Sequence, residues 1–315
     1  MFKDLKKIEL HLHLDGSVRV STVEELLNEN NLSNKMIVDN NTKSLTEYLT
    51  KFDLPIKVMQ KKENLIRISK ELVEDLDKDN VIYAEIRFAP IFHINEGLTL
   101  EDIVNSVLEG LKSDKVKTNL ILCMMRNSSY EDNKRIIDLA IKYKNKGVCA
   151  IDLAGDESKY PTSMFKDLFE YARNNDILFT IHAGEAGTIN DMIDAINYGT
   201  KRIGHGIKAI ESSDIINKLI ENKIALEICP TSNIQTCVVD SLDNHPIKQL
   251  NDNNVLITIN TDNRTVSNTT LSKEYELLNK HFNFTKDDFV KFNINAINSS
   301  FLNINDKDEL IKKIT

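Results

Sequence analysis

Histidine and acidic residues stand at the ends of several short apolar runs in this sequence. These ends are His11-Leu-His13, His182-Ala-Gly-Glu185, Gly-His205-Gly and Thr-Asp262-Asn263. Neutral imidazole nitrogen and carboxylate oxygen are good ligands for zinc and similar divalent ions. We therefore expect a metal site, with proton transfer left to Glu185 and His205 and with four ligands: His11, His13, His182 and Asp262.

A divalent ion at such a site would make water reactive. A catalytic zinc site has about three or four protein ligands and keeps one position open for water. The ion lowers the pKa of that water from near 16 to about 7, which makes hydroxide available at neutral pH. The sequence therefore favours hydrolytic chemistry, provided that the ligands meet in space.

Each short pattern also has an ordinary structural interpretation. A lone His-x-His, a histidine between glycines or a Thr-Asp-Asn turn is common in proteins without a metal. The joint pattern is more specific, because four of the seven histidines stand at the ends of predicted strands. The other three, His93, His245 and His281, lack this setting, and we expect structural roles for them.

The elements that must position these residues alternate between strand and helix. Eight β-branched or apolar runs predict strands over Ile8–His13, Val81–Phe88, Asn119–Met124, Val148–Leu153, Leu178–His182, Arg202–His205, Ile224–Ile228 and Val255–Asn260. Apolar residues at helical spacing lie between most of them, for example over 131–143, Phe165–Arg173 and Asp214–Glu221. This alternation predicts an α/β fold with parallel strands, and eight such units predict a closed (β/α)8 TIM barrel.

A doubly wound open sheet is the alternative α/β fold. That fold would place a glycine-rich phosphate turn after the first strand, where this chain has His11-Leu-His13-Leu-Asp15-Gly. We therefore expect one barrel domain over 1–315, with a helical insertion at about 16–80 that caps one mouth and extra helices after residue 270. The carboxyl ends of barrel strands meet at one rim, so residues about 250 positions apart would converge there.

Composition excludes several other classes of protein. The 315 residues include 40 Lys and Arg against 48 Asp and Glu, and a net charge of -8 leaves no basic footprint for nucleic acid. No apolar run of about 18 residues predicts a membrane span, and the first residues do not resemble a signal peptide. The four cysteines form no Cys-x-x-Cys pair and are typical of reduced structural thiols. We expect a cytoplasmic monomer or weak homo-oligomer whose partner is a small molecule, not nucleic acid or a membrane.

Other catalytic motifs are missing from the sequence. It contains no P-loop, no Gly-x-Ser-x-Gly nucleophile elbow and no His-Glu-x-x-His helix. The Pro-Cys-x-x-Cys signature of one class of zinc deaminase is also missing, because no second cysteine follows Cys229-Pro230 at the required spacing.

Several longer motifs occur in order along the chain. They are Glu9-Leu-His-Leu-His-Leu-Asp-Gly-Ser17, Arg87-Phe-Ala-Pro90, Asp152-Leu-Ala-Gly-Asp-Glu157, His182-Ala-Gly-Glu185, Arg202-Ile-Gly-His-Gly206, Cys229-Pro-Thr-Ser-Asn233 and Asn260-Thr-Asp262. Together they resemble the adenosine deaminase family of metal-dependent barrel hydrolases, and the resemblance runs nearly end to end. It implies a hydrolase of nucleosides that uses one Zn2+ per chain.

The resemblance also implies roles in the metal chemistry. The zinc ligands of the family match His11, His13, His182 and Asp262. His205 and Asp262 match the pair that orients and deprotonates the water. Strand four ends in Asp-Leu-Ala-Gly without a lysine, whereas relatives with two metals use a carbamylated lysine there. We therefore expect a single metal.

Further roles concern the substrate. Glu185 matches the acid that protonates purine N1, and Asp15 matches the residue that holds a ribose hydroxyl. The backbone N–H of Gly155 matches the group that meets N3, and His13 also faces the substrate. An apolar stripe in the insertion matches the family's lid over the substrate: Leu45, Tyr48, Leu49 and Phe52.

Asn263 departs from the family pattern. The better-known members have a second aspartate here, which must be protonated before it can donate a hydrogen bond to N7. An amide donates without needing an extra proton. We therefore predict that Asn263 contacts N7 directly.

The implied reaction is the conversion of adenosine and water to inosine and ammonia, with 2′-deoxyadenosine as a second substrate, in purine salvage. Asp15 supports a nucleoside, because enzymes of the family for free adenine have glutamate there. Two alternatives stay open. One is deamination of another 6-aminopurine, such as adenine, N6-methyl-AMP or an aminofutalosine-type nucleoside. The other is an inactive barrel that only binds a nucleoside.

Overall fold

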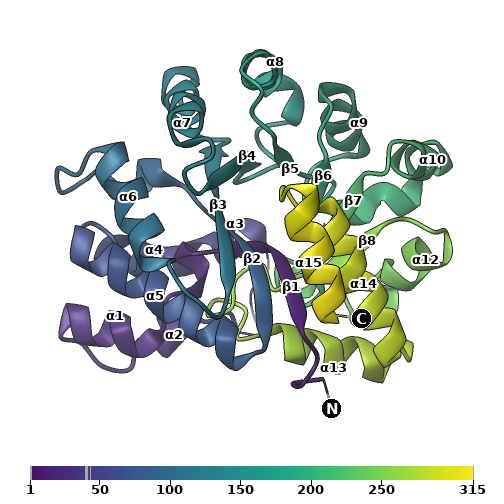
Figure 1. Cartoon of the computed structure of the whole chain (residues 1–315), viewed down its shortest axis with the longest axis horizontal. Helices are drawn as coiled ribbons and strands as arrows, with labels where there is room; N and C mark the ends of the chain where they lie inside the picture. The colour runs from purple at the N-terminus through teal and green to yellow at the C-terminus, as the bar shows by residue number, and fades with distance from the viewer. Residues whose placement is uncertain (1, 40–41, 43, 315) are drawn as a thin grey trace.

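A ring of eight parallel β-strands surrounded by helices makes up the computed structural model of the chain (Figure 1). The structure describes residues 2–39, 42 and 44–314. The strands are β1 (Lys7–His13), β2 (Val81–Phe88), β3 (Lys117–Met125), β4 (Val148–Ala154), β5 (Thr180–Ala183), β6 (Arg202–His205), β7 (Ala225–Ile228) and β8 (Ile257–Ile259). Every predicted strand is present, and no predicted end is wrong by more than two residues.

Backbone pairing closes the ring. Strands β1 to β4 form one parallel sheet in sequence order, and β5 to β8 form another. Single parallel bridges join the two sheets at both seams, between Ile151 and Phe179 and between Leu12 and Asp262. The predicted (β/α)8 barrel is thereby confirmed, since a doubly wound sheet would leave its two edges open.

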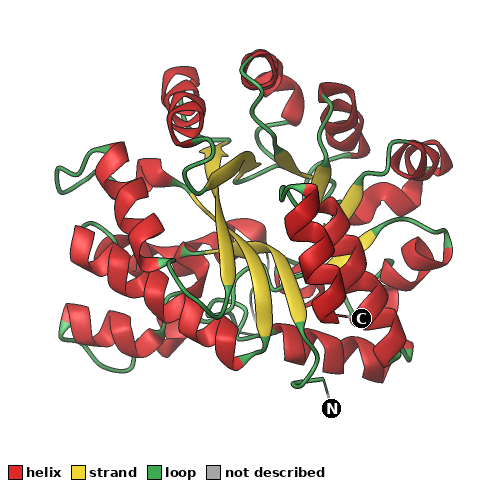
Figure 2. Ribbon diagram, in the orientation of Figure 1, coloured by secondary structure: helices red, strands yellow, loops and turns green. Residues whose placement is uncertain are grey.

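The helices lie outside the ring of strands (Figure 2). The long first crossover contains α1 (Val20–Leu27), α2 (Ser33–Met36), α3 (Leu45–Leu49), α4 (Asp53–Val58) and α5 (Lys62–Lys78). The later crossovers contain α6 (Leu100–Gly110), α7 (Tyr130–Tyr143), α8 (Lys166–Asn174), α9 (Ile189–Tyr198), α10 (Ser213–Glu221), α11 (Pro230–Gln235) and α12 (Ile247–Asp252). The helical insertion expected after the first strand therefore lies between β1 and β2.

Three helices follow the barrel: α13 (Leu271–Phe282), α14 (Lys286–Ser299) and α15 (Ile304–Ile314). The last two, yellow in Figure 1, pack against the first residues of β1 and β2. The shared apolar cluster consists of Ile8, Leu10, Tyr83, Ala296, Ile297 and Leu310. These helices cover the amino-terminal end of the barrel, so the opposite end is left for chemistry.

A turn after β8 carries Asp262 toward β1. The side chain of Asn260 ends the strand, because its Oδ1 takes the backbone N–H of His11 at 3.1 Å. The N–H of Asp262 then donates to the carbonyl of His11 at 3.0 Å, and its carbonyl accepts from the N–H of His13 at 2.8 Å. The backbone thus places an aspartate beside two histidines of the first strand.

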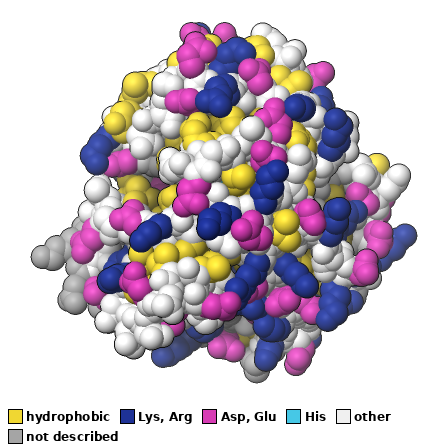
Figure 3. Space-filling view, turned by 90° about the vertical axis from the view of Figure 1, so that its left-hand side faces the viewer, with side chains coloured by type: hydrophobic (Ala, Val, Ile, Leu, Met, Phe, Trp, Pro, Cys, Tyr) yellow, Lys and Arg dark blue, Asp and Glu magenta, His cyan; other side chains and the backbone are white. Residues whose placement is uncertain are grey.

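The outer surface mixes charges of both signs. Figure 3 looks onto the side where α1, α5 and α6 lie, and lysine and arginine alternate there with aspartate and glutamate. Arg67 pairs with Glu25 at 2.7 Å, and Arg19 pairs with Asp75 at 2.7 Å. Within the described residues, no helix has the length and apolar character needed to span a membrane.

Candidate metal centre and active site

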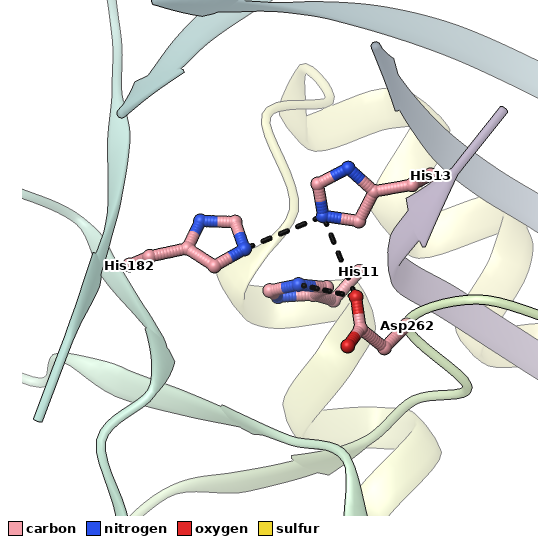
Figure 4. Close-up of side chains that lie close together, drawn as sticks. All are labelled: His11, His13, His182 and Asp262. Atoms are coloured by element: carbon pink, nitrogen blue, oxygen red, sulfur yellow. Dashed lines mark hydrogen bonds and ion pairs between the residues drawn. The ribbon is translucent and has the colours of Figure 1, made fainter. Parts of the chain in front are cut away.

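Four predicted site residues meet at the carboxyl end of the barrel (Figure 4). His11 and His13 come from β1, His182 comes from β5, and Asp262 follows β8. One ligand atom from each lies within 4.8 Å of the others. His13 Nε2 is 3.3 Å from His182 Nε2, and Asp262 Oδ1 is 3.4 Å from Nε2 of both His11 and His13. The geometry therefore gathers the whole predicted ligand set around one point.

These atoms fit a divalent cation. His11 Nε2 is buried and has no hydrogen-bond partner among the described residues. His13 and His182 direct their Nε2 atoms at each other, and two lone pairs at that distance repel unless a cation or a proton lies between them. Ligands about 2.0–2.1 Å from one tetrahedral centre lie about 3.3–3.4 Å apart, which matches the observed separations.

Asp262 is held in a strained backbone conformation. Its φ is +60°, in the left-handed region that residues other than glycine rarely adopt. Such strain persists where surrounding contacts over-determine it, and it clusters at functional sites. Ser232 Oγ donates to Asp262 Oδ2 at 2.6 Å. The second oxygen, Oδ1, is thereby left facing the histidines.

Two buried carboxylates orient the histidines from behind. Glu227 Oε2 is 2.8 Å from His11 Nδ1, and Asp152 Oδ2 is 2.9 Å from His182 Nδ1. Arg87 bridges the two acids, at 2.9 Å from each. A carboxylate on Nδ1 fixes the ring orientation and makes Nε2 a better ligand. The Nε2 atoms of His11 and His182 are thus oriented to bind a metal ion.

Replacing Asp152 with asparagine is expected to weaken zinc binding about 10- to 100-fold, because His182 loses the negative charge that lies 2.9 Å from its Nδ1. Zinc affinity is measured by competition with a chromophoric chelator, with the fold checked by circular dichroism. Asp79→Asn is the matched control, since Asp79 is also buried and bound to an arginine (Arg264, 3.2 Å) but lies elsewhere in the protein. Unchanged affinity in a folded Asp152→Asn protein would contradict the orienting role.

Glu185 lies on the turn that follows β5. Glu157 holds that turn by accepting the backbone N–H groups of Gly184 at 2.6 Å, Glu185 at 3.0 Å and Gly187 at 2.9 Å. Thr236 Oγ1 donates to Glu185 Oε1 at 3.2 Å. The carboxyl group is therefore fixed in position on a rigid turn.

The surroundings of Glu185 favour its protonated form. Burial first, and then the negative charges of Asp262 and Glu157, raise the pKa of Glu185 to about 8, although His182 acts in the opposite direction. A carboxyl group that keeps its proton at neutral pH can act as a general acid.

His205 ends β6 and is buried. Its Nδ1 lies 3.0 Å from Nδ2 of Asn233. Because an amide nitrogen only donates, Nδ1 accepts, and the proton of the neutral ring lies on Nε2. That Nε2 is 3.7 Å from Glu185 Oε2. His205 thus presents an N–H to the same space as the acid.

A cavity of about 470 Å³ opens over these groups. The predicted substrate residues line it: His13, Asp15, Gly155 and Asn263. Leu45, Tyr48, Leu49 and Phe52 line it as well, so the apolar stripe of the insertion covers the site. Burial raises the pKa of Asp15 to about 7. A cavity with one apolar wall and a few converging polar groups suits a small ligand.

Several residues at the site had no predicted role: Arg87, Asp152, Glu227, Ser232 and Asn233. All but Glu227 lie in the quoted motifs. A usable signal existed, because Arg87, Asp152 and Glu227 are charged residues inside buried parallel strands. Such residues need partners, and that need could have marked them for attention.

The remaining histidines and cysteines lie outside the ligand set. His93 is buried against Phe88, with ring centroids 5.7 Å apart, and His281 is 3.7 Å from Asp243. His245 Nε2 lies 3.3 Å from Asn233 Oδ1 and so supports the partner of His205. All four cysteines are free; three are buried or half-buried, and Cys237 is exposed.

A closed parallel barrel with three histidines, an aspartate and a glutamate of raised pKa at its carboxyl rim defines a metal-dependent hydrolase of the amidohydrolase type. The chain belongs to the adenosine deaminase family, whose model matches residues 6–315. As a member of this family, it is a hydrolase that acts on C–N bonds.

Individual relatives match over the full chain. The adenosine deaminase of Clostridium kluyveri is 42% identical over 99% of this chain and 94% of that protein. The adenosine deaminase of Clostridium acetobutylicum is 43% identical over 99% of this chain and 97% of that protein. Among solved structures, the Arabidopsis N6-mAMP deaminase superposes with a TM-score of 0.89 at 29% identity, covering 99% of this chain and 98% of that one.

Proposed function

We propose that this protein catalyses the zinc-dependent hydrolytic deamination of adenosine and 2′-deoxyadenosine to the corresponding inosine and ammonia, in purine salvage. One observation carries the proposal: three of the four clustered ligands (His13, His182 and Asp262) line the same cavity as the raised-pKa carboxyl of Glu185. Hydrolysis of an amidine needs a nucleophilic water and an acid within reach of one purine ring.

The proposed reaction divides between the metal and the chain. A zinc ion held by the four ligands would supply a water acidic enough to act as nucleophile at neutral pH. Attack at C6 moves electron density onto N1, and protonated Glu185 donates its proton there. The Nε2–H of His205 would donate a hydrogen bond to the attacking oxygen. Asp262 would take the proton that the water loses and return it to the departing ammonia.

Three other residues would hold the nucleoside. Asp15 would accept a ribose hydroxyl, and Asn263 would donate to N7. The N–H of Gly155 would meet N3, at a position where φ is +104° and a side chain would be strained. All three line the cavity.

The charge in the cavity favours a nucleoside over a nucleotide. Among the described residues that line it, Lys159 is the only lysine or arginine, and its Nζ is 2.7 Å from Asp156 Oδ2. Asp15 and Asp53 also line the cavity. A 5′-phosphate would meet carboxylates without a free cation, which disfavours N6-methyl-AMP, the compound for which the Arabidopsis neighbour is named.

A substrate panel tests the proposal. The zinc-loaded protein is given adenosine, 2′-deoxyadenosine, adenine, AMP and N6-methyl-AMP, and turnover is followed by ultraviolet absorbance. We expect kcat/KM for adenosine to exceed that for AMP by about 100-fold at low salt, because like charges brought together cost several kcal/mol. Asp156→Asn removes the carboxylate partner of Lys159, so it should lower the ratio of kcat/KM for adenosine to kcat/KM for AMP.

The control for this panel is Asp138→Asn, a surface acid paired with Lys134 at 2.8 Å, which should leave the ratio unchanged. A preference for either nucleotide would contradict the nucleoside assignment. Binding of adenosine without turnover would favour an inactive nucleoside-binding barrel.

A further inference from the structure

The hydroxyl of Tyr48 joins the lid to the turn after β8. It accepts a hydrogen bond from Asn263 Nδ2 at 2.9 Å and lies 2.8 Å from Ser267 Oγ. All three residues are at most 3% exposed. Tyr48 and Asn263 both line the cavity. The lid therefore meets the substrate site through a buried polar contact as well as through its apolar wall.

One end of the Asn263 side-chain amide makes no hydrogen bond to any described residue. Its Oδ1 is buried and accepts no hydrogen bond from any described residue. That oxygen lies against Gly16, where a Cβ atom would come within 1.8 Å of it. Nδ2 carries two hydrogens. Within the described part of the chain it donates one hydrogen bond, to the Tyr48 hydroxyl. The second amide hydrogen remains available to a ligand.

The orientation of this amide matters because its two ends have opposite effects on a purine. N7 carries a lone pair and no hydrogen, so an N–H attracts it and a carbonyl oxygen repels it. Rotating the amide by 180° exchanges the two. The Tyr48 hydroxyl lies 2.8 Å from Ser267 Oγ, and either oxygen can be the donor of that hydrogen bond. When Tyr48 donates its proton to Ser267, it can only accept from Asn263, which selects the orientation with Nδ2 on its side.

We propose that Tyr48 is a positioning residue for recognition of the purine base: by accepting one N–H of Asn263, it directs the other toward N7. This inference rests on the proposed adenosine deamination and adds a specificity element to that site. It also gives α3 a second function, because the helix that covers the substrate also sets the hydrogen bond that distinguishes its base.

Contacts at the cavity mouth keep α3 in place for this task. Thr46 Oγ1 donates to Asp156 Oδ2 at 3.3 Å, and Lys159 Nζ donates to Thr46 Oγ1 at 3.4 Å. Both partners belong to the loop after β4, on the far side of the mouth from Asn263. The helix is thus tied to two separate parts of the rim, which limits where the Tyr48 hydroxyl can lie.

The test removes the hydroxyl and keeps the ring, in Tyr48→Phe. Calorimetry on the zinc-loaded protein measures the dissociation constants of purine riboside and of 7-deazapurine riboside, in which C–H replaces N7. We expect Tyr48→Phe to weaken purine riboside about 5- to 10-fold and to change the 7-deaza analogue by less than about twofold. Tyr275→Phe is the matched control, because its buried hydroxyl bonds to Asn293 at 3.1 Å and does not line the cavity.

A double-mutant cycle adds a readout that lid packing alone would not produce. In an Asn263→Ala background, Tyr48→Phe should cause no further loss for purine riboside. Equal loss for both analogues, no loss for either, or an undiminished loss in the Asn263→Ala background would each overturn the inference. The wild-type protein is also tested for adenosine turnover. Lack of turnover would overturn the proposed function, whereas the outcomes named above would overturn only the role of Tyr48.

Discussion

Glu185→Gln is expected to lower kcat/KM for adenosine about 1,000-fold, the scale of a lost general acid. Glutamine keeps the size of the side chain but has no proton to transfer to N1. Glu185 is not one of the four clustered ligands, so zinc content and Tm should stay at wild-type values. Steady-state kinetics and elemental analysis measure the two quantities.

Glu274→Gln is the control for this substitution. Glu274 is also a buried acid whose pKa burial raises to about 7, but it accepts hydrogen bonds from Thr231 and Thr269 and does not line the cavity. It should retain activity. A Glu185→Gln protein with more than about a tenth of wild-type kcat/KM would contradict the assignment of Glu185 as the acid.

The pH profile should follow the same proton. Glu185 must be protonated to act, and burial with the charge of Asp262 raises its pKa to about 8. Activity should therefore be level through neutral pH and fall as the pH rises through that value. The positive charge of a bound zinc would draw the fall toward lower pH. The residual activity of Glu185→Gln should not show this fall at high pH.

Removal of the metal is expected to abolish deamination. Without the cation there is no activated water, and His13 and His182 are left with nitrogen atoms 3.3 Å apart. Dialysis against a chelator should bring turnover to background, and one equivalent of zinc should restore it. The free energy of unfolding should also decrease, by about 4 kcal/mol if zinc had been present at about 1,000 times its Kd.

Two histidine substitutions sharpen this experiment. His182→Ala should lose both zinc and activity, whereas His281→Ala, a change at an exposed residue beside Asp243, should retain both. Elemental analysis is expected to find one zinc per chain. Two tightly bound metals per chain, or full turnover after chelation, would contradict the proposed centre.

The strands were predictable because their signal is local. Apolar runs such as Val81–Phe88 are buried on both faces of a parallel sheet, so they read as strands without knowledge of their neighbours. Their ends were less certain. Strand β8 stops at Ile259 because the Asn260 side chain takes N–H groups of β1, and the sequence does not show which distant backbone a side chain will cap.

The partners of Asp152 and Glu227 within the site could likewise not be predicted from the sequence. Each acid meets a histidine from another strand, and Arg87 joins them across the barrel. Which charges meet depends on strand register and on the closure of the ring. A linear sequence shows only that these charges are inside strands and need partners.

The amino-acid sequence by itself determined the alternation of strand and helix, the ligand types and their place at strand ends, since these depend on spacings of a few residues. Tertiary structure alone decided that His11 and Asp262 share one centre. It also decided that Asn233 fixes which ring nitrogen of His205 carries the proton, and that Tyr48 forms a hydrogen bond with Asn263. The physical reason is that such contacts join residues far apart in the chain, and only a closed barrel brings the carboxyl ends of all its strands to one rim.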